Sequence, residues 1–298
     1  MGHDRDGLHP GSAVVARPVP ADWLALRRRA DHRAREDALD LLELLTHHLR
    51  ARGVDELVVV DVGAGTGSNQ AWLAPRLPGH QRWVLVDHDA DLLEHETSTG
   101  ADDRITTERA VATVEDLPSL VPQDGTALLA CAALLDLLSA AEIETLAHVV
   151  APDAAPGAAA LLSLTVTGEV VLTPGHPADA VVTTAFDAHQ RREGRPGPDA
   201  AEVMARALRR RGARVELRAT DWLLGTENEP LLRRYLHDRA AVAVEHDPGL
   251  APVVQGWLEE RSLQLEAGSL RARVGHLDLL SLPPEPVDEG AGAAPRSR

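Results

Sequence analysis

The stretch LVVVDVGAGTG, residues 57–67, decides how the first half of this chain is arranged. Its apolar, β-branched start is typical of a buried strand, and glycine then takes every second position, at Gly63, Gly65 and Gly67. Glycine has no Cβ and tolerates positive φ angles, so the backbone of such a turn can approach a ligand closely. With the helix expected over 69–77, the stretch predicts a strand, a ligand-binding turn and a helix.

A second strand is expected over 82–86, and it ends on Asp87, twenty residues past Gly67. A carboxylate at the tip of the second strand can accept hydrogen bonds from both ribose hydroxyls of a nucleoside. An acidic residue that ends a strand can also be an ordinary polar terminus. Its distance from the glycine turn favours the nucleoside interpretation.

The spacing of the glycines distinguishes between cofactors. A dinucleotide fingerprint needs glycine at the first, third and sixth positions, and the sixth position here is Ser68. The acidic-x-Gly-x-Gly-x-Gly pattern from Asp61 to Gly67 instead resembles motif I of the class I S-adenosylmethionine (SAM)-dependent methyltransferases. This resemblance implies SAM as cofactor and methyl transfer to an oxygen or nitrogen atom. A non-catalytic SAM- or nucleoside-binding protein and, less favoured, an NAD(P)-dependent oxidoreductase stay open.

The charge and the aromatic content argue against a nucleic-acid substrate. The formal charge of −16 would repel a phosphate backbone at long range. The chain has one Phe, one Tyr and five Trp, too few to suggest stacking platforms for bases. It also has no Lys, which excludes a Schiff base to lysine. We therefore expect a small-molecule substrate.

Cys131 is the only cysteine, so neither an intramolecular disulfide nor a thiolate metal cluster can form, and we expect no metal. No stretch is long and apolar enough for a membrane span, and residues 1–20 lack the apolar core of a signal peptide. We expect a cytoplasmic protein without a membrane partner. The sequence does not indicate an oligomeric state.

Strand-like and helix-like segments alternate along the chain, which predicts a doubly wound α/β fold with a mostly parallel sheet. Seven strands are expected at 57–62, 82–86, 104–112, 127–131, within 158–167, at 214–219 and at 270–274. Helices are expected at 69–77, 90–96, 114–120, 140–150, 199–211, 229–244 and 252–265. The methyltransferase resemblance implies the same seven strands with only the last one antiparallel.

We expect one SAM-binding domain over residues 21–282, between flexible tails at 1–20 and 283–298. Residues 21–52 have helical periodicity and are predicted to form an N-terminal helical lid. Residues 226–268 are predicted to form a helical insertion between the last two strands. In the methyltransferases that the chain resembles, these two strands are usually close in sequence.

The resemblance also implies where SAM lies, across the carboxyl ends of the first strands. Many relatives carry an acidic residue where this chain has Thr113, so the backbone of Val114, or Glu115 or Asp116, could instead read the adenine amine. Glu115 and Asp116 could equally begin a helix. The implied cofactor-binding residues are Asp61, Gly63, Ala64, Gly65, Thr66, Gly67, Asp87, His88, Thr113, Val114 and Cys131.

Methyl transfer from a sulfonium needs alignment and exclusion of water more than covalent help. His189 and His276 are the candidate proton acceptors, with a structural role open for each. Asp136, Phe186 and Trp222 are the candidate substrate-binding residues. Arg35 could reach the carboxylate of SAM or belong to a solvated helix face.

Overall fold

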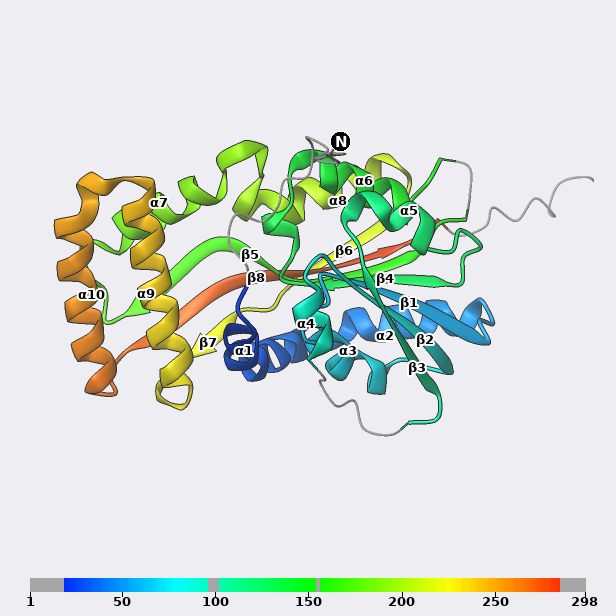
Figure 1. Cartoon of the computed structure of the whole chain (residues 1–298), viewed down its shortest axis with the longest axis horizontal. Coiled ribbons are helices and arrows are strands. Elements are labelled where there is room, and N and C mark those ends of the chain that lie inside the picture. The colour runs from blue at the N-terminus through cyan, green and yellow to red at the C-terminus, as the bar shows by residue number, and fades with distance from the viewer. Residues whose placement is uncertain (1–18, 96–101, 154–155, 285–298) are drawn as a thin grey trace, which may run out of the picture.

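One twisted sheet runs through the molecule, and helices cover both of its faces (Figure 1). The computed structural model describes residues 19–95, 102–153 and 156–284. The strand order is β3-β2-β1-β4-β5-β8-β6, and β7 pairs with β8 beside this path. The predicted doubly wound α/β fold is therefore confirmed. The predicted tails lie almost entirely outside the described residues.

The first four strands are parallel and form one half of the sheet. They are β1 (Glu56–Val62), β2 (His80–Asp87), β3 (Ile105–Val111) and β4 (Ala127–Ala132). Strand β1 lies between β2 and β4 and is buried from Leu57 onward. Apolar side chains therefore occur at consecutive positions, as expected for a strand covered on both faces.

The second half of the sheet differs from the prediction in two details. It contains β5 (Ala159–Thr173), β6 (Arg214–Ala219), β7 (Trp222–Leu224) and β8 (Arg271–Leu282). Strand β8 is antiparallel to its three neighbours and is much longer than the predicted segment 270–274. The described residues form eight strands instead of seven, because three residues at Trp222 pair with the extended start of β8.

Helices cover each face of the sheet through apolar clusters. On one face, Leu41 and Leu45 pack with Trp72 against the sheet. On the other, Leu146 and Leu208 pack against strand residues that include Leu129. The first face carries α2 (Leu39–Ala51) and α3 (Ser68–Leu73), and the second carries α5 (Leu117–Leu120), α6 (Ala140–Val150) and α8 (Ala200–Arg210).

Local sequence signals explain several of these boundaries. Helix α6 begins with a capping box, in which Ser139 Oγ accepts from the Glu142 amide at 3.2 Å and the Glu142 carboxylate accepts from the Ser139 amide at 2.7 Å. Asp89 caps α4 (Ala90–Glu94) in a similar way through the amide of Asp91. Short 3₁₀ helices link the elements at Arg35–Ala38, Ala74–Arg76, Val114–Asp116, Leu135–Leu137, Arg192–Gly194, Gly197–Asp199, Thr226–Asn228 and Pro248–Leu250.

A helical cap lies at one end of the molecule, where β5 and β8 extend past the other strands (Figure 1). It consists of α7 (Asp179–Gln190), α9 (Glu229–His246) and α10 (Ala251–Glu266). Leu172 of β5 and Val274 of β8 share an apolar cluster with Leu232, Leu236 and Trp257 of the cap. Helix α1 (Ala21–Ala34) joins the same cluster. The predicted insertion helices are thus present as α9 and α10.

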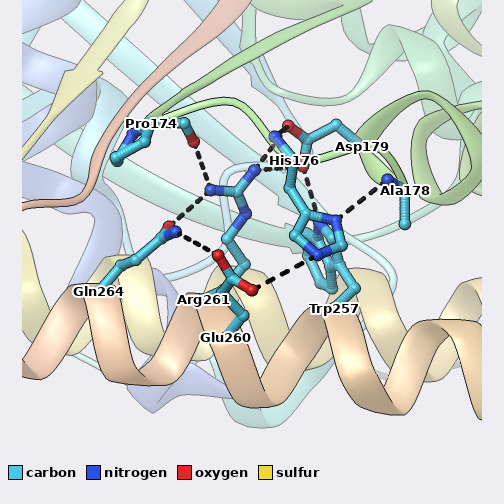
Figure 2. Close-up of polar contacts among 8 residues, drawn as sticks. All are labelled: Pro174, His176, Ala178, Asp179, Trp257, Glu260, Arg261 and Gln264. Atoms are coloured by element: carbon cyan, nitrogen blue, oxygen red, sulfur yellow. Dashed lines mark hydrogen bonds and ion pairs between the residues drawn. The ribbon is translucent and has the colours of Figure 1, made fainter.

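A buried ion pair fastens α10 to the start of α7 (Figure 2). Arg261 is 0% exposed, and its Nη2 lies 2.6 Å from both carboxylate oxygens of Asp179. Its Nη1 donates to the Pro174 carbonyl oxygen at 2.5 Å, and the Trp257 indole donates to Asp179 at 2.7 Å. Burial alone would raise the pKa of Asp179, but the hydrogen bonds from Arg261, Trp257 and the His176 amide outweigh it and lower the pKa.

We expect Arg261→Ala to destabilise the protein by about 3 kcal/mol, because it leaves a partly buried carboxylate without its cation. Urea unfolding followed by circular dichroism measures this change. Arg233→Ala is the matched control, since Arg233 pairs with Glu229 on the exposed side of α9 and should cost less than about 1 kcal/mol. Equal effects of the two substitutions would contradict a role for Arg261 in holding the cap.

Candidate active site

The glycine turn leaves β1 with the backbone conformation that the sequence requires. Gly63, Gly65 and Gly67 all have positive φ angles, of 65°, 53° and 81°. A Cβ on Gly65 would come within 2.9 Å of a methyl carbon of Leu24, and one on Gly63 within 3.0 Å of Leu134. The backbone conformation and the nearby leucine side chains therefore both favour glycine at these two positions.

Asp87 joins the end of β2 to this turn. Its Oδ2 accepts a hydrogen bond from the Gly65 amide at 2.8 Å, and its Oδ1 accepts one from the Asp89 amide at 3.0 Å. His88 Nδ1 lies 3.2 Å from the same Oδ1. The carboxylate is thus fixed in orientation at the sheet edge where β1 and β2 end.

A cavity of about 610 Å³ opens over this edge, within the size range of small-molecule sites. The glycine turn lines one part of it, and α1, α7 and α9 line another. The predicted residues that line it are Gly63, Ala64, Gly65, Thr66, Asp87, His88, Thr113, Val114, Asp136, Phe186, Trp222 and His276.

Four predicted residues are not among those that line the cavity: Asp61, Gly67, Cys131 and His189. Gly67 precedes α3 at the far side of the turn, and Cys131 is a buried core residue of β4, where burial raises the pKa of its thiol. His189 lies near the end of α7, next to Glu245 of α9 at 3.2 Å and Arg192. Their functional roles stay predictions.

Asp61 belongs to a buried polar network beneath the turn. It is 0% exposed and accepts a hydrogen bond from Asn69 Nδ2 at 2.6 Å. Arg35 Nη1 in turn donates to Asn69 Oδ1 at 2.8 Å, and its guanidinium lies 3.8 Å from the centre of the Trp72 ring. Burial raises the pKa of Asp61 to about 7, although the Asn69 hydrogen bond and the charge of Arg35 both act to lower it.

Arg35 and Asn69 both line the cavity. Arg35 therefore lies where the predicted interaction with the carboxylate of SAM requires it. Arg35 is itself buried, and its Nε lies 3.8 Å from Asp278 of β8. The network therefore connects the N-terminal helices to β1 and β8. Of the predicted lid, residues 21–52, only the first part borders the cavity, because α2 packs against the sheet through Leu41 and Leu45.

The segment after β3 shows which of its acidic residues, Glu115 or Asp116, begins a helix and which one lines the cavity. Asp116 forms a capping box with Thr113, whose amide donates to the Asp116 carboxylate at 2.9 Å. Asp116 is therefore a helix-capping residue. Thr113, Val114 and Glu115 line the cavity and can contact a ligand there.

An aromatic cluster forms a second region of the cavity. Trp222 is its centre, with ring centroids 6.5 Å from Trp23, 6.4 Å from Tyr235 and 4.9 Å from His276. The Trp222 indole donates to Asp31 at 3.0 Å. His276 Nδ1 donates to the Val274 carbonyl oxygen at 2.9 Å, which leaves Nε2 as an acceptor, and burial lowers the pKa of His276 to about 4.

Asp136 lies at the cavity wall in the 3₁₀ helix Leu135–Leu137 after β4. It is 7% exposed, and within the described ranges its carboxylate has no hydrogen-bond partner on any other residue. Burial raises the pKa of Asp136 to about 6, against the lowering effect of its own backbone amide and of Arg27. The group can therefore accept a proton near neutral pH.

Sequence reasoning predicted that the helices of residues 21–52 and of the insertion 226–268 cover the substrate, but it named none of the residues of α1 and α9 that line the cavity. Leu24, Arg27, Arg234, Tyr235 and Arg239 all line the cavity. The one signal available was the position of Tyr235, the only tyrosine, within the predicted insertion. In the part of the chain that the structure describes, no group of three or more His, Cys, Asp or Glu side chains could hold a metal ion. None of the described helices is long and apolar enough to cross a membrane.

No protein-family model matches the chain, and no curated protein matches its sequence. A cyclopropane-fatty-acyl-phospholipid synthase-like protein from Lactobacillus casei is 13% identical, with a TM-score of 0.49 over 89% of this chain and 94% of that one. Loganic acid methyltransferase with SAH is 11% identical, with a TM-score of 0.48 over 88% and 95%. A SAM-dependent methyltransferase from Geobacter sulfurreducens in complex with S-adenosyl-L-homocysteine is 18% identical, with a TM-score of 0.38 over 82% and 90%. Similarities this low carry no argument, so the strand order defines the architecture.

The raised pKa of Asp61 predicts a pH-dependent stability. A carboxyl group whose pKa is about 7 in the folded protein, against an ordinary 3.8, destabilises the fold as the pH rises from about 4 to about 7. Asp61→Asn removes this titration. From pH 5 to pH 8, the free energy of unfolding of the variant should rise by on the order of 2 kcal/mol relative to that of the wild type.

Thermal and urea unfolding at both pH values measure the difference. Asp55→Asn, an exposed position just before β1, is the control and should track the wild type. A stability difference between Asp61→Asn and the wild type that does not change with pH would contradict the raised pKa.

Proposed function

We propose that the protein is a SAM-dependent methyltransferase that transfers a methyl group to an oxygen or nitrogen atom of a small-molecule acceptor. The observation that carries this proposal is the cavity in which Asp87 and the bare backbone of the glycine turn meet a separate aromatic region. Two adjoining regions of different chemistry suit a cofactor and an acceptor. The region at the glycine turn offers the Asp87 carboxylate and backbone groups. The aromatic region around Trp222 offers aromatic rings and charged side chains.

The residues of the first region fit the groups of SAM. Asp87 is fixed in place and can accept hydrogen bonds from the ribose hydroxyls. Leu92 and Val114 line the same cavity and provide apolar contacts for a purine. Arg35 and Asn69, which also line it, suit the carboxylate and ammonium of the amino-acid part.

SAM supplies an electrophilic methyl group, and the chain has to align the acceptor, exclude water and remove a proton from it. Asp136 is the best placed described group for the last task. Its carboxylate faces the cavity without another partner, and its raised pKa matches a base that works near neutral pH. His276 also lines the cavity, with Nε2 as an acceptor, and its ring packs against Trp222.

Neither alternative function has a specific observation in its favour. Ser68, where a dinucleotide fingerprint needs its last glycine, is the first residue of α3 and lines the cavity. A non-catalytic SAM-binding protein would bind S-adenosylhomocysteine (SAH) without consuming SAM. Incubation with SAM and a panel of small-molecule acceptors, with SAH formation as readout, separates that alternative from an enzyme.

We expect Asp87→Ala to weaken SAH binding by about 1–3 kcal/mol, because the ribose hydroxyls and the Gly65 amide both lose their acceptor. Isothermal titration calorimetry measures the change. Asp91→Ala is the control, because Asp91 is exposed on the neighbouring α4. This variant should bind SAH as tightly as the wild type does. If the wild type shows no affinity for SAH, the proposed function is wrong.

With an acceptor identified in the panel, Asp136→Asn should lower kcat/KM by about 10²–10⁴-fold, the usual contribution of a general base. In the wild type, kcat/KM should fall as the pH drops below about 6, because Asp136 then becomes protonated. The variant should lack this decline. Asp103→Asn, at an exposed position before β3, serves as control, and an unchanged rate in Asp136→Asn would remove Asp136 from the reaction.

A further inference from the structure

Arg239 of α9 places a buried positive charge at the wall of the cavity. The residue is only 4% exposed. Its Nη1 donates to the hydroxyl of Tyr235 at 3.1 Å, and its guanidinium lies over the rings of Phe186 at 4.2 Å and Tyr235 at 5.4 Å. Its Nη2 has no hydrogen-bond partner among the described residues. The charge of Asp187 acts on it, but Asp187 Oδ1 is likewise without a hydrogen-bond partner in the described part of the chain.

In this arrangement the buried charge of Arg239 is only partly compensated. A buried charge is costly unless it is paired and hydrogen-bonded, and contact with aromatic faces compensates only part of that cost. Three other arginines line the cavity. Arg27 is paired with Asp31 at 2.8 Å and Arg234 with Asp238 at 3.0 Å. Arg35 lies 3.8 Å from Asp278 and belongs to the region proposed for SAM, so Arg239 is the arginine of the aromatic region best able to take an anion from a ligand.

Asp187 and Gln190 of α7 provide the complementary groups. Both line the cavity, and Asp187 Oδ1 and Gln190 Oε1 are buried without a partner in the described part of the chain. Burial raises the pKa of Asp187, although the charges of Arg239 and Arg191 lower it. These oxygens require a hydrogen-bond donor, such as a hydroxyl or amino group of the ligand.

The surrounding side chains indicate the shape and charge of the rest of the ligand. Phe186 and Tyr235 are the only phenylalanine and the only tyrosine of the chain, and both line this cavity together with Trp222. Flat rings favour a flat apolar body. Because Asp187 and Asp238 line the same region, a singly charged carboxylate fits better than a doubly charged phosphate.

We infer that the methyl acceptor is a carboxylic acid with a flat apolar body and a hydroxyl or amino group near its carboxylate. The carboxylate pairs with Arg239, and the hydroxyl or amino group donates to Asp187. This inference rests on the proposed function, because it assigns the acceptor region of the same cavity. It is independent of which atom receives the methyl group.

Three small probes test the acceptor class: mandelate, mandelamide and phenylacetate. Each is titrated into protein saturated with SAH, and its binding is measured by ligand-observed NMR. Mandelamide lacks the charge, and phenylacetate lacks the hydroxyl. Mandelate should bind at least tenfold more tightly than mandelamide and more tightly than phenylacetate. Equal affinities for mandelate and mandelamide, or no binding of any probe, would overturn the inference.

Arg239→Met should abolish the preference for mandelate over mandelamide, and Arg239→Lys should retain part of it. Arg233→Met changes an exposed arginine of the same helix and should leave the preference intact. SAH titration of each variant verifies that the protein is folded. If the wild type does not bind SAH, the proposed function itself is refuted. If the wild type binds SAH but shows no preference for mandelate over mandelamide, only the acceptor class is refuted.

Discussion

The hydrogen bond from the Gly65 amide to Asp87 joins the two features on which the site depends. Parallel pairing of β1 with β2 brings their carboxyl ends to one sheet edge, with Val62 opposite Val86. The turn after β1 and the carboxylate that ends β2 therefore meet without any help from distant parts of the chain. Glycine is favoured in this turn, because its φ angles are positive and a Cβ at Gly63 or Gly65 would press on the side chain of Leu134 or Leu24.

The other region of the cavity depends on a different constraint, the length of β5 and β8. These strands pair antiparallel far beyond the ends of the parallel strands, and their extensions carry α7, α9 and α10 (Figure 1). The ion pair between Arg261 and Asp179 joins α10 to α7 within this assembly (Figure 2). Residues of α7 and α9 line the same cavity as the glycine turn.

The sequence predicted the first half of the fold well because its signals there are local. The β-branched run, the glycine spacing and Asp87 each identify an element, and Gly63, Gly65 and Asp87 line one cavity, although Asp61 and Gly67 do not. Helix α7 was not predicted, because prolines and glycines lie close to it on both sides and interrupt the helical pattern. Strand β7 has only three residues, so its pairing with β8 has no signature of its own. Arg239 could not be selected among so many arginines, because its burial depends on how α9 packs against Phe186 and Tyr235.

The strongly acidic composition sets a limit on how an anionic ligand can be recognised here. A formal charge of −16 repels anions at long range, but salt screens such interactions beyond a Debye length of about 8 Å at physiological ionic strength. Recognition of a carboxylate must therefore come from short-range contact inside the cavity, where screening is weak. Arg239 meets this requirement because its guanidinium is buried and fixed by Tyr235 and Phe186 before any ligand arrives. A preorganised charge loses little side-chain entropy on binding, so one arginine can select a carboxylate against the field of the whole protein.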